Sequence, residues 1–159
     1  FIPAVRDDDP EARAKVALAA TLAGMGFGNA GVHVPHANAY PIAGRVRDYR
    51  PPDYPQDEPI IPHGMAVALT APAAFRLTEQ ASPERHSRAA HLLGGEDLPT
   101  TLQAIMDTVG MPTGLRAVGY SEADIPDLVE GAQAQQRLLA LAPLELTADD
   151  LATIFEESM

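Results

Sequence analysis

The sequence contains no cysteine and no tryptophan, and it has few positively charged residues. Without cysteine the chain can form no disulfide, thiolate zinc site, iron–sulfur cluster or cysteine nucleophile. Only 11 Lys and Arg residues stand against 22 Asp and Glu residues, which gives a formal net charge of −11. Nucleic acids and anionic membranes attract clustered positive charge, so this composition argues against both kinds of partner.

Long apolar runs and a leader sequence are also missing. No uninterrupted apolar stretch reaches the roughly 18–20 residues that span a bilayer. The segment from Phe1 to Asp9 is acidic where a signal peptide would be basic. We therefore expect a soluble protein with no membrane partner. A chain of 159 residues can bury a core without disulfides or metal, so residues 1–159 are expected to form a single domain.

Helix signals recur along the chain, whereas strand signals do not. Asp9-Pro10-Glu11, Ser82-Pro83-Glu84 and Asp97-Leu98-Pro99 each combine an N-cap acceptor with a proline in the first turn. Ser121-x-x-Asp124 and Thr147-x-x-Asp150 resemble capping boxes with Asp in place of Glu. No segment shows the period-two alternation of a strand. The sequence predicts an all-α protein, a helical bundle of about seven helices.

The segments between these starts give further expectations. The helix from Pro10 ends in the glycine-rich stretch 24–31, and these glycines predict close helix packing and a tight turn. A second helix begins near Val32, and Pro41 should end or kink it. Residues 45–62 contain five prolines and predict an extended loop, followed by a helix over 64–75.

The last 39 residues carry nine carboxylates and a single arginine, Arg137. Such a segment forms either an acidic docking surface or a set of solvated helix faces. Solvated faces are the favoured interpretation, because charged helix surfaces are common in proteins without an acidic-surface partner.

Three of the five histidines, His33, His36 and His63, lie between residues 24 and 64. His36 and Tyr40 are four residues apart and would share one face of a helix, as would His33 and His36. His63 would lie in the first turn of the next helix. Two imidazoles from separate helix ends can begin a metal site, but a stable site needs three or four ligands. By spacing alone, capping or packing is the favoured role of these histidines.

Other motifs indicate no chemistry by themselves. His86 and His91 are expected on a helix surface. Gly24-x-Gly26-x-Gly28 is not a dinucleotide-binding fingerprint, because it ends a helix instead of following a strand. No Ser/His/Asp triad, phosphate-binding loop or carboxylate pair rises above chance.

Two segments together carry a resemblance to a known family. Residues 24–42 read Gly-Met-Gly-Phe-Gly-Asn-Ala-Gly-Val-His-Val-Pro-His-Ala-Asn-Ala-Tyr-Pro-Ile, and Pro62-His63-Gly64 follows later. They resemble the C-terminal half of the iron-containing (group III) alcohol dehydrogenases, in which His-Gly-x-x-His-Pro and Pro-His-Gly each give one histidine to a catalytic iron. The resemblance implies that His36 and His63 bind Fe²⁺ or Zn²⁺. It also implies that Phe27 lines the substrate channel.

Tyr40 stands where this family usually has a second histidine near the nicotinamide. This departure, the proline-rich insertion at 45–62 and the segments 118–126 and 150–159 resemble the hydroxyacid–oxoacid transhydrogenase branch. The resemblance implies that NAD shuttles a hydride from 4-hydroxybutyrate to 2-oxoglutarate. It gives Tyr40 a catalytic role beside the nicotinamide, as a polar wall or a proton-relay member. Ala37-Asn38 departs from the Gly-Met that the family commonly has.

The resemblance also implies a missing part. In the family an N-terminal α/β domain binds NAD, and an Asp-x-x-x-His pair completes the iron site; no such pair precedes His36. We therefore expect residues 1–159 to be a C-terminal fragment that is inactive alone. A generic NAD(P)-dependent alcohol dehydrogenase and a non-catalytic helical interaction module stay open as alternatives. The substrate is expected to be a small hydroxy acid or alcohol, and a homo-oligomer stays open. The expected compartment is the bacterial cytoplasm, or the mitochondrion in a eukaryote.

Overall fold

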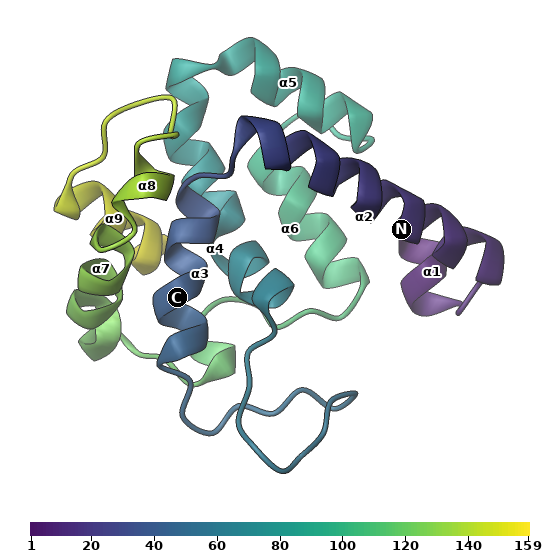
Figure 1. The fold of residues 1–159 in the computed structure, drawn as a ribbon, viewed down its shortest axis with the longest axis horizontal. Helices are drawn as coiled ribbons and strands as arrows, with labels where there is room; N and C mark the ends of the chain where they lie inside the picture. The colour runs from purple at the N-terminus through teal and green to yellow at the C-terminus, as the bar shows by residue number, and fades with distance from the viewer.

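The computed structural model describes residues 1–159 and contains nine α-helices, three short 3₁₀ helices and no strand (Figure 1). The α-helices are α1 (Ile2–Arg6), α2 (Pro10–Ala30), α3 (Val34–Gly44), α4 (His63–Thr78), α5 (Pro83–Leu92), α6 (Leu98–Thr108), α7 (Ile125–Gln133), α8 (Gln136–Leu139) and α9 (Ala148–Glu157). The 3₁₀ helices are η1 (Glu79–Ala81), η2 (Arg116–Val118) and η3 (Glu122–Asp124). The all-α prediction is confirmed. The two helices it did not include, α1 and α8, are five and four residues long.

The helix starts that depend on local hydrogen bonds lie where the sequence predicted them. The Asp9 side chain accepts a 2.9 Å hydrogen bond from the Ala12 amide at the start of α2. Asp97 does the same for the Thr100 amide at 2.8 Å, before α6. Capping boxes begin η3 and α9. The segment between α3 and α4 contains no helix or strand, as its prolines predicted.

The hydrophobic core lies where α3 packs against α4 and α7, with α9 packing against both α4 and α7. Its fully buried side chains include Ile42, Leu115, Leu128, Leu151 and Phe155. Helix α6 packs against the other side of α4, and α5 packs against α6. The core therefore fixes α3 and α4 side by side. No helix is both long enough and apolar enough to cross a membrane.

Pro41 does not end the second helix, so that half of the prediction is wrong, while the alternative, a kink, stays a prediction. Pro41 lies inside α3, and the helix continues to Gly44. A proline within a helix lacks the N–H group for one hydrogen bond, and its ring crowds the carbonyl four residues earlier. Packing around the proline can offset this cost. Pro41 is buried against α7, so closely that a Cβ atom added to Gly131 would lie 2.6 Å from the Pro41 Cβ. Gly131 is therefore what lets α7 approach α3.

The glycines near the end of α2 behave differently from one another. Gly24, Gly26 and Gly28 lie within the helix, and no atom of another element lies within 4 Å of where their Cβ would be. The prediction that they permit close packing is therefore wrong within this chain. The predicted turn is confirmed at Gly31, which ends α2 with φ 77°. A side chain there would also collide with Leu141.

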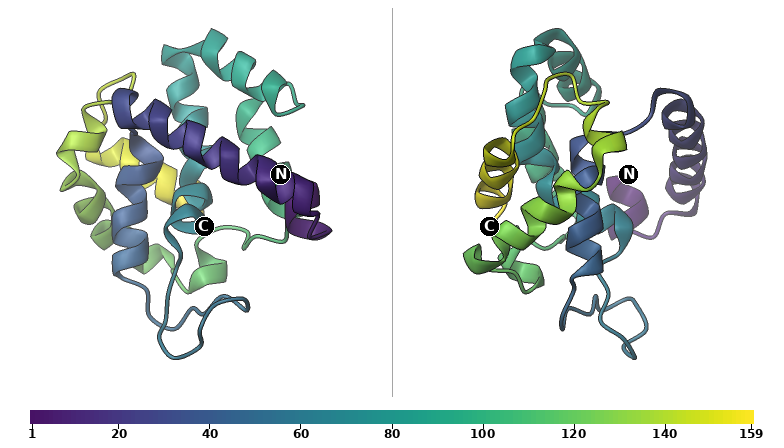
Figure 2. Two further views of the ribbon diagram at one scale, coloured as in Figure 1. Left: turned by 45° about the vertical axis from the view of Figure 1, so that its right-hand side comes forward. Right: turned by 60° about the vertical axis from the view of Figure 1, so that its left-hand side comes forward.

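Helix α2 buries none of its residues. It carries no charged residue from Val16 to Ala30, and Leu18, Leu22 and Met25 are 58–72% exposed. The right-hand view of Figure 2 shows α1 and α2 standing apart from the other helices. Helices that are apolar on every side are ordinarily buried. This helix therefore presents an uncovered apolar surface.

Candidate metal centre and adjoining cavities

His36 and His63 are brought together by the packing of α3 against α4. His36 lies in the first turn of α3, and His63 is the first residue of α4. Their ring centroids are 5.4 Å apart, with the ring planes inclined at 57°. Two residues 27 positions apart in the sequence thus meet at the N-terminal ends of two packed helices.

The electrostatics of His36 suit a metal ligand. Burial lowers its pKa below the ordinary 6.5, and the neighbouring His63 lowers it further. The ring is therefore neutral at pH 7. A neutral imidazole is the form that donates a lone pair to a metal ion.

The pair fits part of a metal site. Imidazoles with centroids 5.4 Å apart can both reach one ion, because metal–nitrogen bonds are about 2.0–2.1 Å long. No group of three or more His, Asp or Glu side chains in the chain is placed to hold a metal ion. The chain thus offers two ligands where a stable site needs three or four.

The other two predicted site residues lie at the surface. Tyr40 is 51% exposed on α3, one turn after His36, and its hydroxyl makes no hydrogen bond within the chain. Phe27 is 50% exposed near the end of α2 and lines neither of the cavities described below. The structure therefore does not join Phe27 to the histidine pair, and the roles of both residues stay predictions.

One cavity lies beside His36, and a second cavity shares part of its wall. The smaller, about 240 Å³, is lined by His33, His36 and Phe75 among others. The larger, about 430 Å³, lies between α4, α5 and α6, and we call it the α5 cavity. His33 and Phe75 line both cavities, with their rings edge to face and 5.9 Å between centroids. These two rings therefore form a wall that the two cavities have in common.

His86 is buried, which contradicts its predicted place on a helix surface. It is 8% exposed, and its ring meets the Phe75 ring edge-on at 5.7 Å. Its Nδ1 donates to the Ser82 carbonyl at 2.9 Å, and its Nε2 shares a hydrogen bond of 3.1 Å with the Thr78 hydroxyl. The prediction for His91 is confirmed, since it is exposed.

A pattern in the sequence of α5 could have located His86. Ala90 is buried, and Ala89 is partly buried, on the face that His86 shares. Leu93 follows at the next turn and lines the same cavity as His86 and Ala89. Positions 86, 89, 90 and 93 follow the i, i+3, i+4, i+7 pattern of a core-facing helix stripe.

His33 is the N-cap residue of α3 and differs from His86 in its hydrogen bonding. Its Nδ1 atom is buried and has no hydrogen-bond partner. Burial lowers the pKa of its ring, with smaller contributions from His36 and His86. His33 is therefore a neutral ring with one unsatisfied nitrogen. No sequence pattern distinguishes it from the other two histidines of its cluster.

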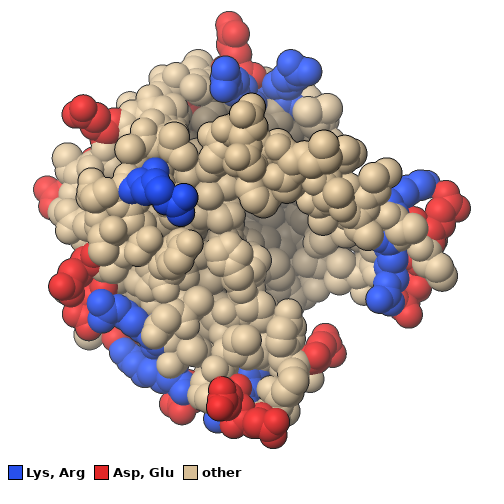
Figure 3. Space-filling model, viewed as in Figure 1, with Lys and Arg blue, Asp and Glu red and all other residues tan.

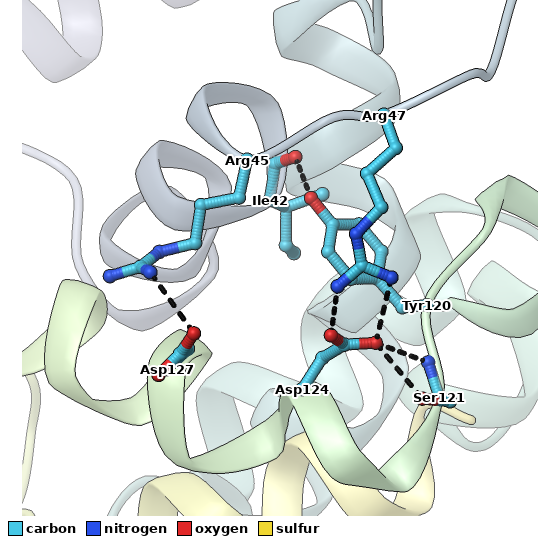
Figure 4. A network of polar contacts seen from close by, with 7 residues as sticks. All are labelled: Ile42, Arg45, Arg47, Tyr120, Ser121, Asp124 and Asp127. Carbon is cyan, nitrogen blue, oxygen red and sulfur yellow. Dashed lines mark hydrogen bonds and ion pairs between the residues drawn. The ribbon is translucent and has the colours of Figure 1, made fainter.

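A polar network fixes the other end of α3 (Figure 4). The Tyr120 hydroxyl donates to the Ile42 carbonyl at 2.6 Å, and burial raises the Tyr120 pKa to about 12. Beside it the Arg47 guanidinium forms two hydrogen bonds with the Asp124 carboxylate, which also accepts from the Ser121 amide at 2.8 Å. The hydrogen bond from Arg47 lowers the Asp124 pKa. The network ties the start of the proline-rich loop to η3.

The acidic residues of the C-terminal part are spread over several such contacts. Asp127 lies 3.4 Å from Arg45, and Glu157 lies 2.5 Å from Arg76. Asp150 takes part in the capping box of α9. These three carboxylates are thus engaged within the chain, and the choice between solvated helix faces and an acidic docking surface stays a prediction.

Comparison with known proteins identifies the family. The sequence model described as "Fe-containing alcohol dehydrogenase family, C-terminal" matches residues 2–159. The chain belongs to this family. It is 46% identical over 168 residues to the mitochondrial hydroxyacid-oxoacid transhydrogenase of Homo sapiens, and 45% identical over 163 residues to that of Bos taurus. These alignments cover 98% and 96% of this chain but 36% and 35% of the relatives. The chain thus spans about a third of their length.

Solved structures of iron-containing alcohol dehydrogenases and related enzymes share the fold. The alcohol dehydrogenase of Oenococcus oeni superposes with a TM-score of 0.82 at 26% identity, covering 99% of this chain and 40% of that one. An archaeal halo-thermophilic alcohol dehydrogenase from a Red Sea brine pool gives 0.83, with the same identity and coverage. The resemblance to the family and to its transhydrogenase branch is confirmed.

Proposed function

We propose that this chain is the metal-binding helical part of an NAD-dependent hydroxyacid–oxoacid transhydrogenase that acts on 4-hydroxybutyrate and 2-oxoglutarate. The observation that carries the proposal is the meeting of His36 and His63, 5.4 Å apart between ring centroids, at the ends of two packed helices. It occurs in a chain that is 45% identical to the bovine transhydrogenase over 96% of its length.

His36 and His63 hold Fe²⁺ or Zn²⁺ in this proposal, and the remaining ligands belong to the part of the protein that the longer relatives have in addition. When bound, the ion supplies Lewis acidity at an alcohol oxygen and NAD supplies the hydride acceptor. The lowered pKa of His36 keeps its lone pair available at neutral pH. The core around α3 and α4 holds both rings in place.

Tyr40 handles the proton of the reaction. Oxidation of the carbinol carbon releases a hydride and a proton, and reduction of the oxo acid consumes both, so the two half-reactions balance. The Tyr40 hydroxyl lies one turn from His36 and is not engaged within the chain. It can relay the proton, accepting the one from the alcohol as it donates its own to solvent, and the reverse when the oxo acid is reduced. Phe27 provides an apolar wall of the channel through which the substrate enters.

The test uses the protein expressed from its whole gene and loaded with Fe²⁺. With catalytic NAD present, 4-hydroxybutyrate and 2-oxoglutarate should be converted together to succinic semialdehyde and 2-hydroxyglutarate. His36→Ala and His63→Ala should each lower metal content and turnover by at least about 100-fold, because loss of even an outer-shell partner costs 10–100-fold. His91→Ala, on the exposed face of α5, is the matched control and should keep wild-type metal content and turnover.

Other outcomes point to the alternatives. Oxidation of simple alcohols with NAD(P) and no coupled reduction of 2-oxoglutarate would identify a generic alcohol dehydrogenase. Tight metal binding that survives His36→Ala would overturn the ligand assignment. Absence of any oxidoreductase activity would favour a helical interaction module. Residues 1–159 alone are expected to bind Fe²⁺ or Zn²⁺ weakly and to be inactive, because two ligands do not complete a site.

A further inference from the structure

Helices α3 and α4, which carry His36 and His63, are joined by a single hydrogen bond. The Asn38 Nδ2 donates to the Thr70 hydroxyl at 3.3 Å, and no other hydrogen bond links the two helices. Both side chains are fully buried. Asn38 lies two residues after His36, which is about 3 Å along the axis of α3. The one polar link between the helices therefore begins within one turn of a proposed metal ligand.

No ion pair joins α3 to α4. Helix α3 contains no Asp, Glu, Lys or Arg, and the only such residue of α4, Arg76, pairs with Glu157 of α9. On the face that Figure 1 views, Figure 3 shows charged side chains around the edge and none in the hollowed centre beneath α2. No pair of charges therefore fixes the position of α3 against α4.

The other buried residues of α3 and α4 are apolar, apart from Thr78. Many of them are alanines that are at most 4% exposed, namely Ala37, Ala39, Ala66, Ala73 and Ala74. Apolar contact has no preferred direction, and short alanine side chains form only shallow ridges and grooves. This packing therefore sets the distance between the two helices but resists sliding of one along the other only weakly.

A metal site tolerates very little sliding. Metal–ligand distances in a good site lie within about 0.2 Å of their usual values. One residue of an α-helix, in contrast, rises about 1.5 Å. A shift of α3 along α4 by a fraction of one residue would therefore move His36 and His63 away from the positions at which both bind one ion.

The Asn38 side chain can prevent such a shift. A hydrogen bond weakens steeply when its distance or angle changes, so it holds the two helices at one register. A single buried asparagine fixes the register of packed helices in coiled coils, at a cost in stability. Asn38 has such a cost, because its buried Oδ1 has no hydrogen-bond partner.

We propose that the Asn38–Thr70 hydrogen bond sets the register of α3 against α4 and thereby holds His36 and His63 where both can bind one metal ion. This proposal rests on the proposed function. Asn38 and Thr70 are positioning residues, which act through the two helices and not as ligands.

The test measures the zinc affinity of metal-free protein expressed from the whole gene, by competition with a chelator of known affinity. Thr70→Val should weaken Zn²⁺ binding by about 10-fold, the lower end of the range for residues that orient metal ligands. Thr70→Ser keeps the hydroxyl and should retain the affinity. The matched control is Thr78→Val, because Thr78 is also a fully buried threonine of α4 but shares its hydrogen bond with His86 of α5. This control should leave the zinc affinity unchanged.

Two further readouts separate the register of the helices from the stability of the protein. The double variant Asn38→Leu with Thr70→Val should regain stability, because both polar groups are gone, but should not regain zinc affinity. The visible absorption of bound Co²⁺ depends on the arrangement of its ligands. Thr70→Val should therefore change the Co²⁺ spectrum, and Thr78→Val should not.

The outcomes distinguish this proposal from the proposed function. Zinc affinity that falls in His36→Ala but not in Thr70→Val overturns the positioning role and leaves the proposed function standing. Affinity lost equally in Thr70→Val and Thr78→Val, or regained in the double variant, also overturns the positioning role, because affinity then follows stability. A wild-type protein that binds no zinc, or an His36→Ala variant that binds it equally well, contradicts both proposals.

Discussion

The Tyr120 hydroxyl donates a hydrogen bond of 2.6 Å to the backbone carbonyl of Ile42, 78 residues earlier in the chain. Ile42 lies in the last turn of α3, where backbone carbonyls have no donor within the helix. Both residues are buried. A side chain from beyond η2 thus completes the helix that carries His36.

Removing this hydroxyl should destabilise the protein. Tyr120→Phe leaves a buried carbonyl without a partner, which costs about 1–3 kcal/mol in free energy of unfolding. Thermal or urea unfolding of the protein expressed from the whole gene measures the loss. Tyr54→Phe is the control, because Tyr54 is 44% exposed and its hydroxyl makes no hydrogen bond within the chain. Equal stability of the two variants would show that Tyr120 contributes nothing through its hydroxyl.

Adding a methyl group at Gly131 should separate α3 from α7. The new Cβ would lie 2.6 Å from the Pro41 Cβ, so the helices must shift, at a cost of about 1–3 kcal/mol. Gly44→Ala is the matched control, since no atom lies within 4 Å of its Cβ position. The measurement is the urea midpoint of each variant. A Gly131→Ala variant as stable as Gly44→Ala would contradict the close approach.

Replacing both Asn38 and Thr70 with apolar residues should cost less stability than replacing Thr70 alone. Both residues are fully buried, the Asn38 Nδ2 donates to the Thr70 hydroxyl at 3.3 Å, and the Asn38 Oδ1 has no partner. Thr70→Val leaves the whole Asn38 amide unsatisfied and should cost about 1–3 kcal/mol. Asn38→Leu with Thr70→Val removes both polar groups and should recover stability. A double variant less stable than Thr70→Val would overturn this account.

His33 and His36 should become protonated only at a pH below 6.5, the ordinary pKa of histidine. Burial lowers both pKa values from 6.5, so the unfolded chain binds more protons than the folded chain as the pH falls. The stability that these rings contribute is present above pH 6.5 and is lost as the pH falls through their folded pKa values. NMR titration of the ring protons of metal-free protein measures both midpoints, with the exposed His91 as internal reference. Midpoints at or above 6.5 would contradict the burial of the two rings.

Loss of the Tyr40 hydroxyl should slow turnover without removing metal. If Tyr40 carries the proton, Tyr40→Phe should lower kcat by about 100-fold or more, the usual contribution of general acid–base catalysis. Metal content should stay at the wild-type level, because Tyr40 is not a proposed ligand. Tyr54→Phe again serves as control. Unchanged turnover in Tyr40→Phe would refute the proton role.

Features set by neighbouring residues could be predicted from the sequence. Asp9, Asp97 and the Thr147–Asp150 box cap their helices through hydrogen bonds to residues three positions away. All the residues that form each cap can therefore be read from one short stretch of sequence. The continuation of α3 past Pro41 could not be predicted, for the opposite reason. The place of Pro41 inside α3 depends on a glycine of α7, 90 positions later, and no local pattern contains that contact.

The same limit applies to the candidate site. Family resemblance predicted His36 and His63, and the structure brings their rings together. It gave no sign of which arginines form ion pairs, because pairs such as Arg76 with Glu157 join residues 81 positions apart. The pairing of each arginine is decided by the whole fold.

The exposed apolar length of α2 has a practical consequence for work on residues 1–159 alone. The core between α3, α4, α7 and α9 contains no residue of α2, and no residue of α2 is buried. Apolar surface of this kind adheres to chaperones, hydrophobic resins and other copies of the same chain. We therefore expect association through α2 to limit how concentrated a preparation of this region can become.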